Sequence, residues 1–148
     1  MNRYELANSY HNQGYNCCQS IVAAFADKTG LSFETSVNVS EGFGGGAGSG
    51  ELCGALSGAI MVLGLTNPVD PEDVVGSKRR VQVLSKKLQK RFSAQFGAVR
   101  CIELLQNRNI NGETATGPAK EMGLTNHCAI MIVTAVSVVE DLLAEMGK

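Results

Sequence analysis

Glycine is concentrated in one short part of the 148-residue chain, and this feature most limits how the chain can fold. Nine of the 17 glycines lie between Gly42 and Gly64, and most of these nine fall within Gly42–Gly50. A stretch so rich in glycine loses too much backbone entropy on folding to form a regular helix or strand. The sequence therefore predicts an irregular loop over Gly42–Gly50.

An apolar segment, Cys53–Leu63, follows this loop and ends before Gly64. The segment is apolar on all sides, which predicts a fully buried central helix. Gly54 and Gly58 lie four residues apart, so one face of this helix is almost bare backbone. A neighbouring helix is therefore expected to approach that face closely.

Helix-capping patterns recur along the rest of the chain. Asn16, with Gln19 three residues later, forms a capping box for a helix that runs to about Thr29. Asn126 caps a final helix, although the β-branched residues of Ile130–Val139 would also suit a strand. The other predicted helices are Tyr4–Tyr10, Phe33–Glu41, Pro71–Phe96 (capped by Asp70), Ala98–Gln106 and Pro118–Met122.

Composition agrees with a globular protein built from these helices. Hydrophobic residues make up 44% of the chain and the net charge is only −1, so a core can form and general disorder is excluded. We predict an all-α fold, a single-domain helical bundle over residues 1–148 around the buried glycine-rich central helix.

The chain shows no obvious targeting or membrane segment. Met1–Ala7 contains no apolar run, and the longest apolar stretches, Leu52–Leu65 and Ala129–Val139, are shorter than the roughly 20 residues that span a bilayer. We therefore expect a soluble cytoplasmic protein without a membrane partner, in which stable structural disulfides are not expected.

Five cysteines in such a protein need another explanation: Cys17, Cys18, Cys53, Cys101 and Cys128. They form no Cys-x-x-Cys pair, so neither a zinc ribbon nor a thioredoxin-type site is indicated. Cys17, Cys53 and Cys128 fall at the starts of predicted helices. Free N–H groups and the helix dipole favour a thiolate at such places.

This placement leads to an expected order of acidity. The thiols of Cys17 and Cys53 are expected to be the most acidic, because Asn16 and the glycine loop supply many N–H groups. Cys101 lies inside a predicted short helix and is expected to be less acidic than Cys17, Cys53 and Cys128. A free cysteine can also be simply a small buried hydrophobic residue, and Cys18 is the best candidate for that role.

Several segments together resemble one protein family, the C_GCAxxG_C_C family of redox-active proteins. They are Gly14-Tyr15-Asn16-Cys17 with Gln19, Gly44-Gly45-Gly46, Cys53-Gly54-Ala55-Leu56-Ser57-Gly58-Ala59, Phe96-Gly97 with Cys101, and Cys128. By this resemblance the family's four cysteines correspond to Cys17, Cys53, Cys101 and Cys128. Cys18 occupies a position that is commonly alanine.

The family is similar to the non-haem part of split-Soret cytochromes, where an iron–sulfur centre has been proposed. The resemblance therefore implies that the four cysteines act in dithiol/disulfide chemistry or as ligands of an iron–sulfur cluster. We expect their sulfurs to converge near Gly44–Gly50, where Gly44, Gly45, Gly46 and Gly54 bring the backbone close to sulfur. Any disulfide formed in air is expected to leave out Cys18.

Two further readings concern metals and nucleotides. Four thiolates can also hold Zn²⁺, which would make the protein a structural interaction module without redox activity. Gly42–Ala47 fits a relaxed dinucleotide-binding pattern, but no strand precedes it, and Glu51 stands where a phosphate-binding loop has lysine. Nucleotide binding is therefore not indicated.

Basic residues gather in one predicted helix. Seven of the 13 lysines and arginines lie within Lys78–Arg91, and no acidic residue occurs between Val74 and Ile102. Such a face is most often only solvated, and the partner that it would suit is an acidic redox protein. Nucleic acid is not expected, because only Phe92 and Phe96 interleave with the charges.

Two points about surfaces complete these expectations. His127 is expected to be a surface residue, because it points to a different face of its helix from Cys128. Assembly into a homo-oligomer is left open.

Overall fold

The computed structural model describes residues 1–148 and contains helices and turns, with one isolated antiparallel bridge between Leu52 and Arg100. The helices are α1 (Arg3–Asn12), α2 (Cys17–Ala24), α3 (Ala26–Thr29), α4 (Phe33–Ser40), α5 (Gly54–Thr66), α6 (Val74–Phe96), α7 (Cys101–Gln106), α8 (Gly117–Glu121) and α9 (His127–Glu145). The predicted all-α class is confirmed.

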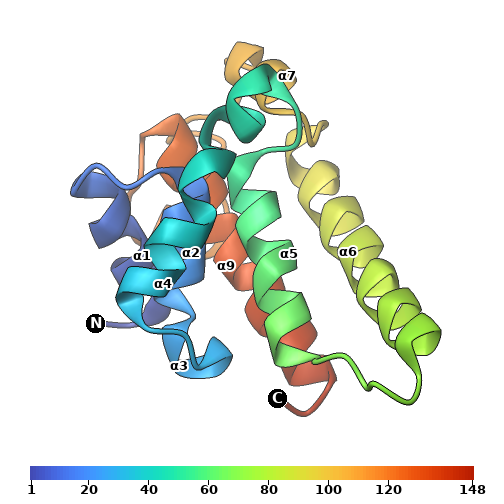
Figure 1. The fold of residues 1–148 in the computed structure, drawn as a ribbon. Coiled ribbons are helices and arrows are strands. Elements are labelled where there is room, and N and C mark those ends of the chain that lie inside the picture. The colour runs from blue at the N-terminus through green and yellow to red at the C-terminus, as the bar shows by residue number, and fades with distance from the viewer.

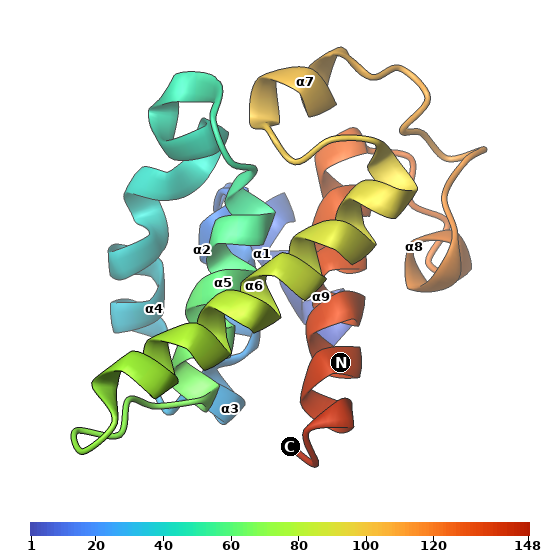
Figure 2. The ribbon, with the colours of Figure 1, turned by 90° about the vertical axis from the view of Figure 1, so that its right-hand side faces the viewer.

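Three helices, α2, α5 and α9, form the centre of the bundle and pack against one another. All three begin at the same end of the molecule and run in the same direction (Figures 1 and 2). The glycine-rich segment and α7 lie at that end, while α6 crosses the outside of α5 and α9 (Figure 2). The positive ends of three helix dipoles are therefore gathered in one place.

The close approach predicted for the glycine face of α5 is observed, and its neighbour is α2. A Cβ atom on Gly58 would lie 3.0 Å from both the carbonyl oxygen of Cys18 and the Cβ atom of Ile21. A Cβ atom on Gly54 would lie 3.3 Å from the Cβ atom of Cys17. The two glycines therefore set the distance between α2 and α5.

The α9 helix is the most deeply buried long helix, and Ile130–Val136 is buried throughout. By length and composition α9 could span a membrane. The apolar stretch noted in the sequence, Ala129–Val139, is shorter than the helix and too short to do so. However, 67% of its most apolar 18-residue window is buried inside the bundle. Its apolar character is therefore accounted for by packing, and the β-branched segment is helical.

Most predicted helix ends are confirmed, but the helix that starts at Asn16 is shorter than predicted. The capping box of Asn16 and Gln19 is present, and Gly30 ends α3 in a left-handed conformation with φ 77°. Between them, Phe25 leaves helical geometry (φ −101°, ψ 16°) and separates α2 from α3. Phe25 is fully buried, so its packing outweighs the local preference for one continuous helix.

The predicted start of α6 at Asp70 and Pro71 is wrong. The Asp70 carboxylate accepts a hydrogen bond from the backbone N–H of Glu72 (2.9 Å), which holds a local turn instead. Asp73 is the true cap, because its carboxylate accepts a hydrogen bond from the N–H of Gly76 (3.0 Å).

The central helix also differs from its prediction. α5 continues through Gly64 to Thr66, and Ile60 and Met61 are only partly buried. α5 is therefore central but not buried on all sides. The face that carries Ile60 and Met61 is only partly covered by other helices.

Candidate functional site

The four cysteines of the family pattern all lie at helix starts. Cys17 is the first residue of α2, Cys53 is the N-cap of α5, and Cys128 is the second residue of α9. Cys101 is the first residue of α7 and not, as predicted, inside a longer helix. The bridge at Arg100 keeps the preceding residues extended, so this helix can begin only at Cys101.

The structure brings these four thiols together at the end of the bundle where α2, α5 and α9 begin. In each of the six pairs among Cys17, Cys53, Cys101 and Cys128, the two sulfurs are close enough for one to shift the pKa of the other. Cys18 is fully buried on the side of α2 that packs against α5, and Cys53 is the one cysteine that shifts its pKa. The four cysteines of the family pattern therefore lie within electrostatic reach of one another.

The glycine-rich segment packs over this end of the bundle as two short turns, Glu41–Phe43 and Gly46–Gly50. Gly44 lies against the side chain of Asn16, and a Cβ atom on Gly46 would lie 2.9 Å from the Cβ atom of Cys101. Gly45 has open space around it but a φ of 65°, which glycine adopts at least cost. Larger residues at Gly44 or Gly46 would push the segment off the cysteines.

Cys53 and Cys101 are held side by side by the backbone. The N–H of Cys53 donates to the carbonyl of Val99 (2.8 Å), and the N–H of Cys101 donates to the carbonyl of Glu51 (2.6 Å). These two bonds flank the bridge between Leu52 and Arg100. Two cysteines that are 48 residues apart in sequence are thereby placed on neighbouring strands of backbone.

Cys17 and Cys128 meet through their side chains, from the starts of α2 and α9. The thiol of Cys17 donates a hydrogen bond to the sulfur of Cys128, and this bond is the main reason why the pKa of Cys128 falls to about 5. Burial opposes this shift, while His127 and, more weakly, His11 add to it. The same hydrogen bond, together with burial, raises the pKa of Cys17 far above its ordinary value.

The other cysteine thiols have raised pKa values. Burial is the main cause at Cys53, where it raises the pKa to about 11 although the N–H groups of Ala55 and Leu56 lower it. Burial also raises the pKa of Cys18 to about 12, and that of Cys101 by a smaller amount. The expectation that Cys17 and Cys53 would be the most acidic thiols is therefore wrong, because burial and nearby sulfurs outweigh the helix N-terminus.

His127 is not the surface residue that the sequence suggests. Its Nε2 atom makes a 2.6 Å hydrogen bond with the carbonyl oxygen of Leu104 in α7, and its Nδ1 atom is buried without a hydrogen-bond partner. His11, from α1, also has a buried Nδ1 atom without a partner. Nothing local in the sequence joins His11 to Cys128, because α1 reaches this position only through tertiary packing.

A surface depression of about 510 Å³ gives access to Cys128. Its lining includes Leu105, Arg108 and Ile110 on one side and His127 and Cys128 on the other. Cys128 is half-buried, whereas Cys53 is buried. Of the site thiols, Cys128 is therefore both acidic and within reach of a molecule in solution.

The positions of the cysteine and histidine side chains limit which metal groups the site could hold. All five cysteines are free thiols, and no three Cys, His, Asp or Glu side chains are grouped so that they could share one metal ion. Four thiolates around one zinc ion lie within about 4 Å of one another, since each Zn–S bond is ~2.3 Å. The side chains as placed do not fit a single tetrahedral ion.

A helical bundle that gathers four cysteines at its helix starts defines a thiol-rich all-α protein. The chain belongs to the family described as "Putative redox-active protein (C_GCAxxG_C_C)", whose model matches residues 15–142. No curated protein and no solved structure matches the chain. The family resemblance read from the sequence is thus confirmed, and redox activity is the function that the site has to explain.

Proposed function

We propose that the protein exchanges electrons by thiol–disulfide chemistry, with Cys128 as the attacking thiol and Cys17 as the resolving thiol. The observation that carries this proposal is the contact between these two side chains, made from the starts of two packed helices. A redox-active pair needs one thiolate that can attack and a second thiol close enough to complete the disulfide. Cys17 and Cys128 divide these two tasks.

Protonation supports this division. At pH 7 a thiol with a pKa of about 5 is almost entirely thiolate, and Cys128 is in that state. Cys17 holds its proton against Cys128 until the first step has removed the negative charge there. The depression beside Cys128 lets a disulfide approach this sulfur, and Cys17 is not part of its lining.

The reaction is a two-electron exchange with a disulfide as the oxidant. The Cys128 sulfur attacks one sulfur of the disulfide, the S–S bond breaks, and the departing thiolate takes a proton from water. The Cys17 thiol then loses its proton, attacks the Cys128 sulfur, and releases the second half of the substrate as a thiol. One disulfide and two protons give two thiols, and the chain is left with a Cys17–Cys128 disulfide.

Cys53 and Cys101 support this pair in the proposal. Their backbones are tied together, and burial keeps the Cys53 thiol protonated. Their sulfurs lie beside the reacting pair and contribute to its environment without exchanging electrons.

The proposal is tested by the redox state of each cysteine. Reduced protein is equilibrated with glutathione buffers of known potential, and the remaining thiols are alkylated and located by mass spectrometry. We expect Cys17 and Cys128 to be lost together as one disulfide while Cys18 remains free. Formation of a Cys53–Cys101 disulfide before the Cys17–Cys128 disulfide would contradict the assignment.

An iron–sulfur cluster is a second candidate, and the meeting of all four sulfurs favours it. A cluster is larger than one ion and spaces its four thiolates more widely. The side chains can therefore be too far apart for a single zinc ion and still suit a cluster. Cys17, Cys53, Cys101 and Cys128 would hold it, and it would supply one-electron transfer. Protein purified without air would then be coloured and contain iron and acid-labile sulfide, whereas colourless protein with one zinc per chain would indicate the structural module.

We further propose that an acidic redox protein docks on the outer face of α6. Six basic side chains there are exposed and form no ion pair: Lys78, Arg79, Arg80, Lys86, Lys87 and Lys90. Only Arg91 at the end of this run is paired, with Glu145 (2.6 Å). An uncompensated row of one charge attracts a surface of the opposite charge and speeds its association.

Docking on this face is tested by raising the salt concentration and by removing the lysine charges. Electron exchange with a small acidic flavoprotein should slow as salt rises, and a K86Q/K87Q/K90Q variant should slow it several-fold at low salt. The K120Q variant, which removes an exposed charge on α8, serves as the control. Equal rates for both variants, or preferential binding to DNA or anionic vesicles, would contradict the proposal.

A further inference from the structure

The depression beside Cys128 is nearly free of charge, and the charge it does have is positive. No Asp or Glu side chain lines it, and the one permanently charged side chain in its lining is Arg108. Its volume of about 510 Å³ falls in the range of small-molecule sites. The depression therefore has a cation and the Cys128 thiol in the same lining.

Arg108 is not used to hold the fold together. The ion pairs of the chain involve Arg3, Arg91 and Arg100, and Arg108 takes part in none of them. Its side chain is exposed and makes no hydrogen bond to another residue, and only its backbone carbonyl is bonded, to the side chain of Asn111 (3.0 Å). The guanidinium group is therefore free to bind an anion from solution.

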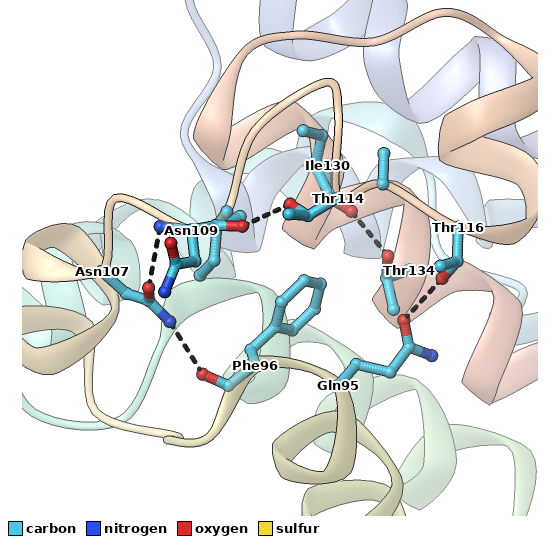
Figure 3. Close-up of a pocket in the computed structure, with 10 residues that line it drawn as sticks. Gln95, Phe96, Asn107, Asn109, Thr114, Thr116, Ile130 and Thr134 are labelled. Carbon is cyan, nitrogen blue, oxygen red and sulfur yellow. Dashed lines mark hydrogen bonds between the residues drawn. The ribbon is translucent and has the colours of Figure 1, made fainter.

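The wall that carries Arg108 is held in place from behind. Figure 3 shows a neighbouring pocket of about 150 Å³ that shares Asn107 and Ile110 with the depression. There the Asn107 amide donates to the Phe96 carbonyl (3.2 Å) and accepts from the N–H of Asn109 (3.0 Å). Thr116 also donates to the side chain of Gln95 (3.2 Å). These bonds fix the loop on both sides of Arg108, so the cation is carried by a preformed wall.

Apolar contact is available between the cation and the thiol. Ile110 is buried and Leu105 is 59% exposed, and both line the same depression. A short hydrocarbon segment of a ligand can lie against them. The lining thus offers, within one depression, a sulfur that can attack, an apolar surface and a cation.

We infer that the substrate of this site is a small disulfide that carries a carboxylate near its S–S bond, and that Arg108 binds this carboxylate. The inference rests on the proposed thiol–disulfide function and names its substrate class. Arg108 holds the carboxylate, Leu105 and Ile110 contact the carbons between carboxylate and sulfur, and Cys128 attacks the nearer sulfur. The carboxylate is unchanged by the reaction, and the second half of the disulfide leaves as a thiol.

Arg108 has a second effect on such a substrate. The thiolate of Cys128 repels an anionic disulfide, and a free thiolate therefore reacts more slowly with an anionic disulfide than with a neutral one. A guanidinium in the wall offsets this repulsion and can form two parallel hydrogen bonds to the carboxylate. Selectivity for the anionic substrate is thus expected to depend on Arg108.

The experiment compares two disulfides of similar size: neutral bis(2-hydroxyethyl) disulfide and the dianion of 3,3′-dithiodipropionate. The rate of each with reduced protein is divided by its rate with a free small thiol at the same pH, which removes intrinsic reactivity. We expect the anionic disulfide to be favoured by about five-fold at low salt, as a partly exposed ion pair allows. R108Q should abolish this preference, which is expressed relative to the neutral disulfide measured with the same variant.

Two control variants sharpen the result. R108K keeps the charge and should keep part of the preference, and K120Q removes a distant charge and should keep all of it. A preference that survives R108Q, or that is absent from the wild type, would overturn the inference and leave the proposed function standing. If neither disulfide oxidises the protein, the proposed function fails and the inference fails with it.

Discussion

The starts of α9 and α5 carry the same type of residue in almost the same position, yet the two thiols behave in opposite ways. Cys128 in α9 has a pKa of about 5, and Cys53 at the start of α5 has a pKa of about 11. Both helices belong to the core, and both cysteines lie in the first turn, where helix N–H groups are unpaired. The helix N-terminus is thus common to the two sites and does not explain the difference between them.

The difference comes from what surrounds each sulfur. Cys53 is buried, and the loss of water raises its pKa by more than the N–H groups of Ala55 and Leu56 lower it. Cys128 is half-buried, receives a hydrogen bond from Cys17, and lies near His127. A thiol at a helix start therefore becomes acidic only when a donor from another helix reaches it and water is not fully removed.

The largest expected effect separates the two regions by reactivity. C128S should lower the rate of reaction with a small disulfide by about 1,000-fold or more, because the attacking thiolate is lost. C101S should change that rate by no more than about three-fold, since Cys101 is not among the groups that set the pKa of Cys128. Stopped-flow measurement of thiol loss checks both variants, and similar losses in the two would remove the distinction between the regions.

The second effect concerns pH. Alkylation of reduced, metal-free protein, read at each site by mass spectrometry, should reach half its maximal rate near pH 5 for Cys128 and near pH 11 for Cys53. At pH 7 the two rates should differ by about 10- to 40-fold, because the thiolate fraction outweighs the lower nucleophilicity of an acidic thiol.

The C17A variant tests the cause of this acidity. Without the hydrogen bond from Cys17, the alkylation midpoint of Cys128 should rise by about one pH unit or more. C101S serves as the control and should leave the midpoint nearly unchanged. Titration of all four cysteines together near the ordinary thiol value would show that neither region differs from a free thiol.

The third effect concerns the close packing of α2 against α5, which places the helix starts side by side. G58A should destabilise the protein by about 2 kcal/mol, because its Cβ atom would meet the backbone of Cys18 and force α2 away from α5. G64A, in the same helix, meets no atom within 4 Å and should stabilise the protein by about 0.5 kcal/mol. Urea unfolding measures both variants, and equal effects would show that the helices are not in close contact.

The last effect is on stability at alkaline pH, and it is spread over several pH units. Cys53 and Cys18 have raised pKa values in the folded protein, so their contribution to stability is complete below the ordinary thiol pKa. That contribution is lost as the pH rises from about 9 toward 11 or 12, by up to about 1.4 kcal/mol per pH unit for each thiol. C18A should reduce this slope in urea unfolding, whereas C101S should reduce it less.

The contribution of Cys128 to stability changes with pH in the opposite direction. Its pKa is lowered on folding, so its contribution to stability is present above the ordinary thiol pKa and is lost as the pH falls toward about 5. Loss of stability between pH 9 and 5 should therefore be smaller in C128S than in the wild type. An unchanged profile would mean that Cys128 is not acidic in the folded protein.

Local sequence determined most of the helices and the identity of the candidate site. Capping residues such as Asn16 and Asn126 act on N–H groups within three residues, so their effect can be read without knowing the fold. The spacing of Gly54 and Gly58 likewise specified a close helix contact, because four residues return to the same helix face. The start of α6 was misjudged because Asp70 and Asp73 are both good caps, and the local turn at Asp70 decides between them.

Only the tertiary structure decided which thiol is acidic. The pKa of Cys128 depends on Cys17, 111 positions earlier in the sequence, and on His11 from a third helix, while that of Cys53 depends on how much water the bundle removes. Burial and charge–charge interactions depend on distances in space, and a helix start shows only one of the neighbours of a sulfur. The sequence by itself therefore determined that Cys17, Cys53 and Cys128 stand at helix starts, and packing of α1, α2 and α9 determined what their sulfurs can do.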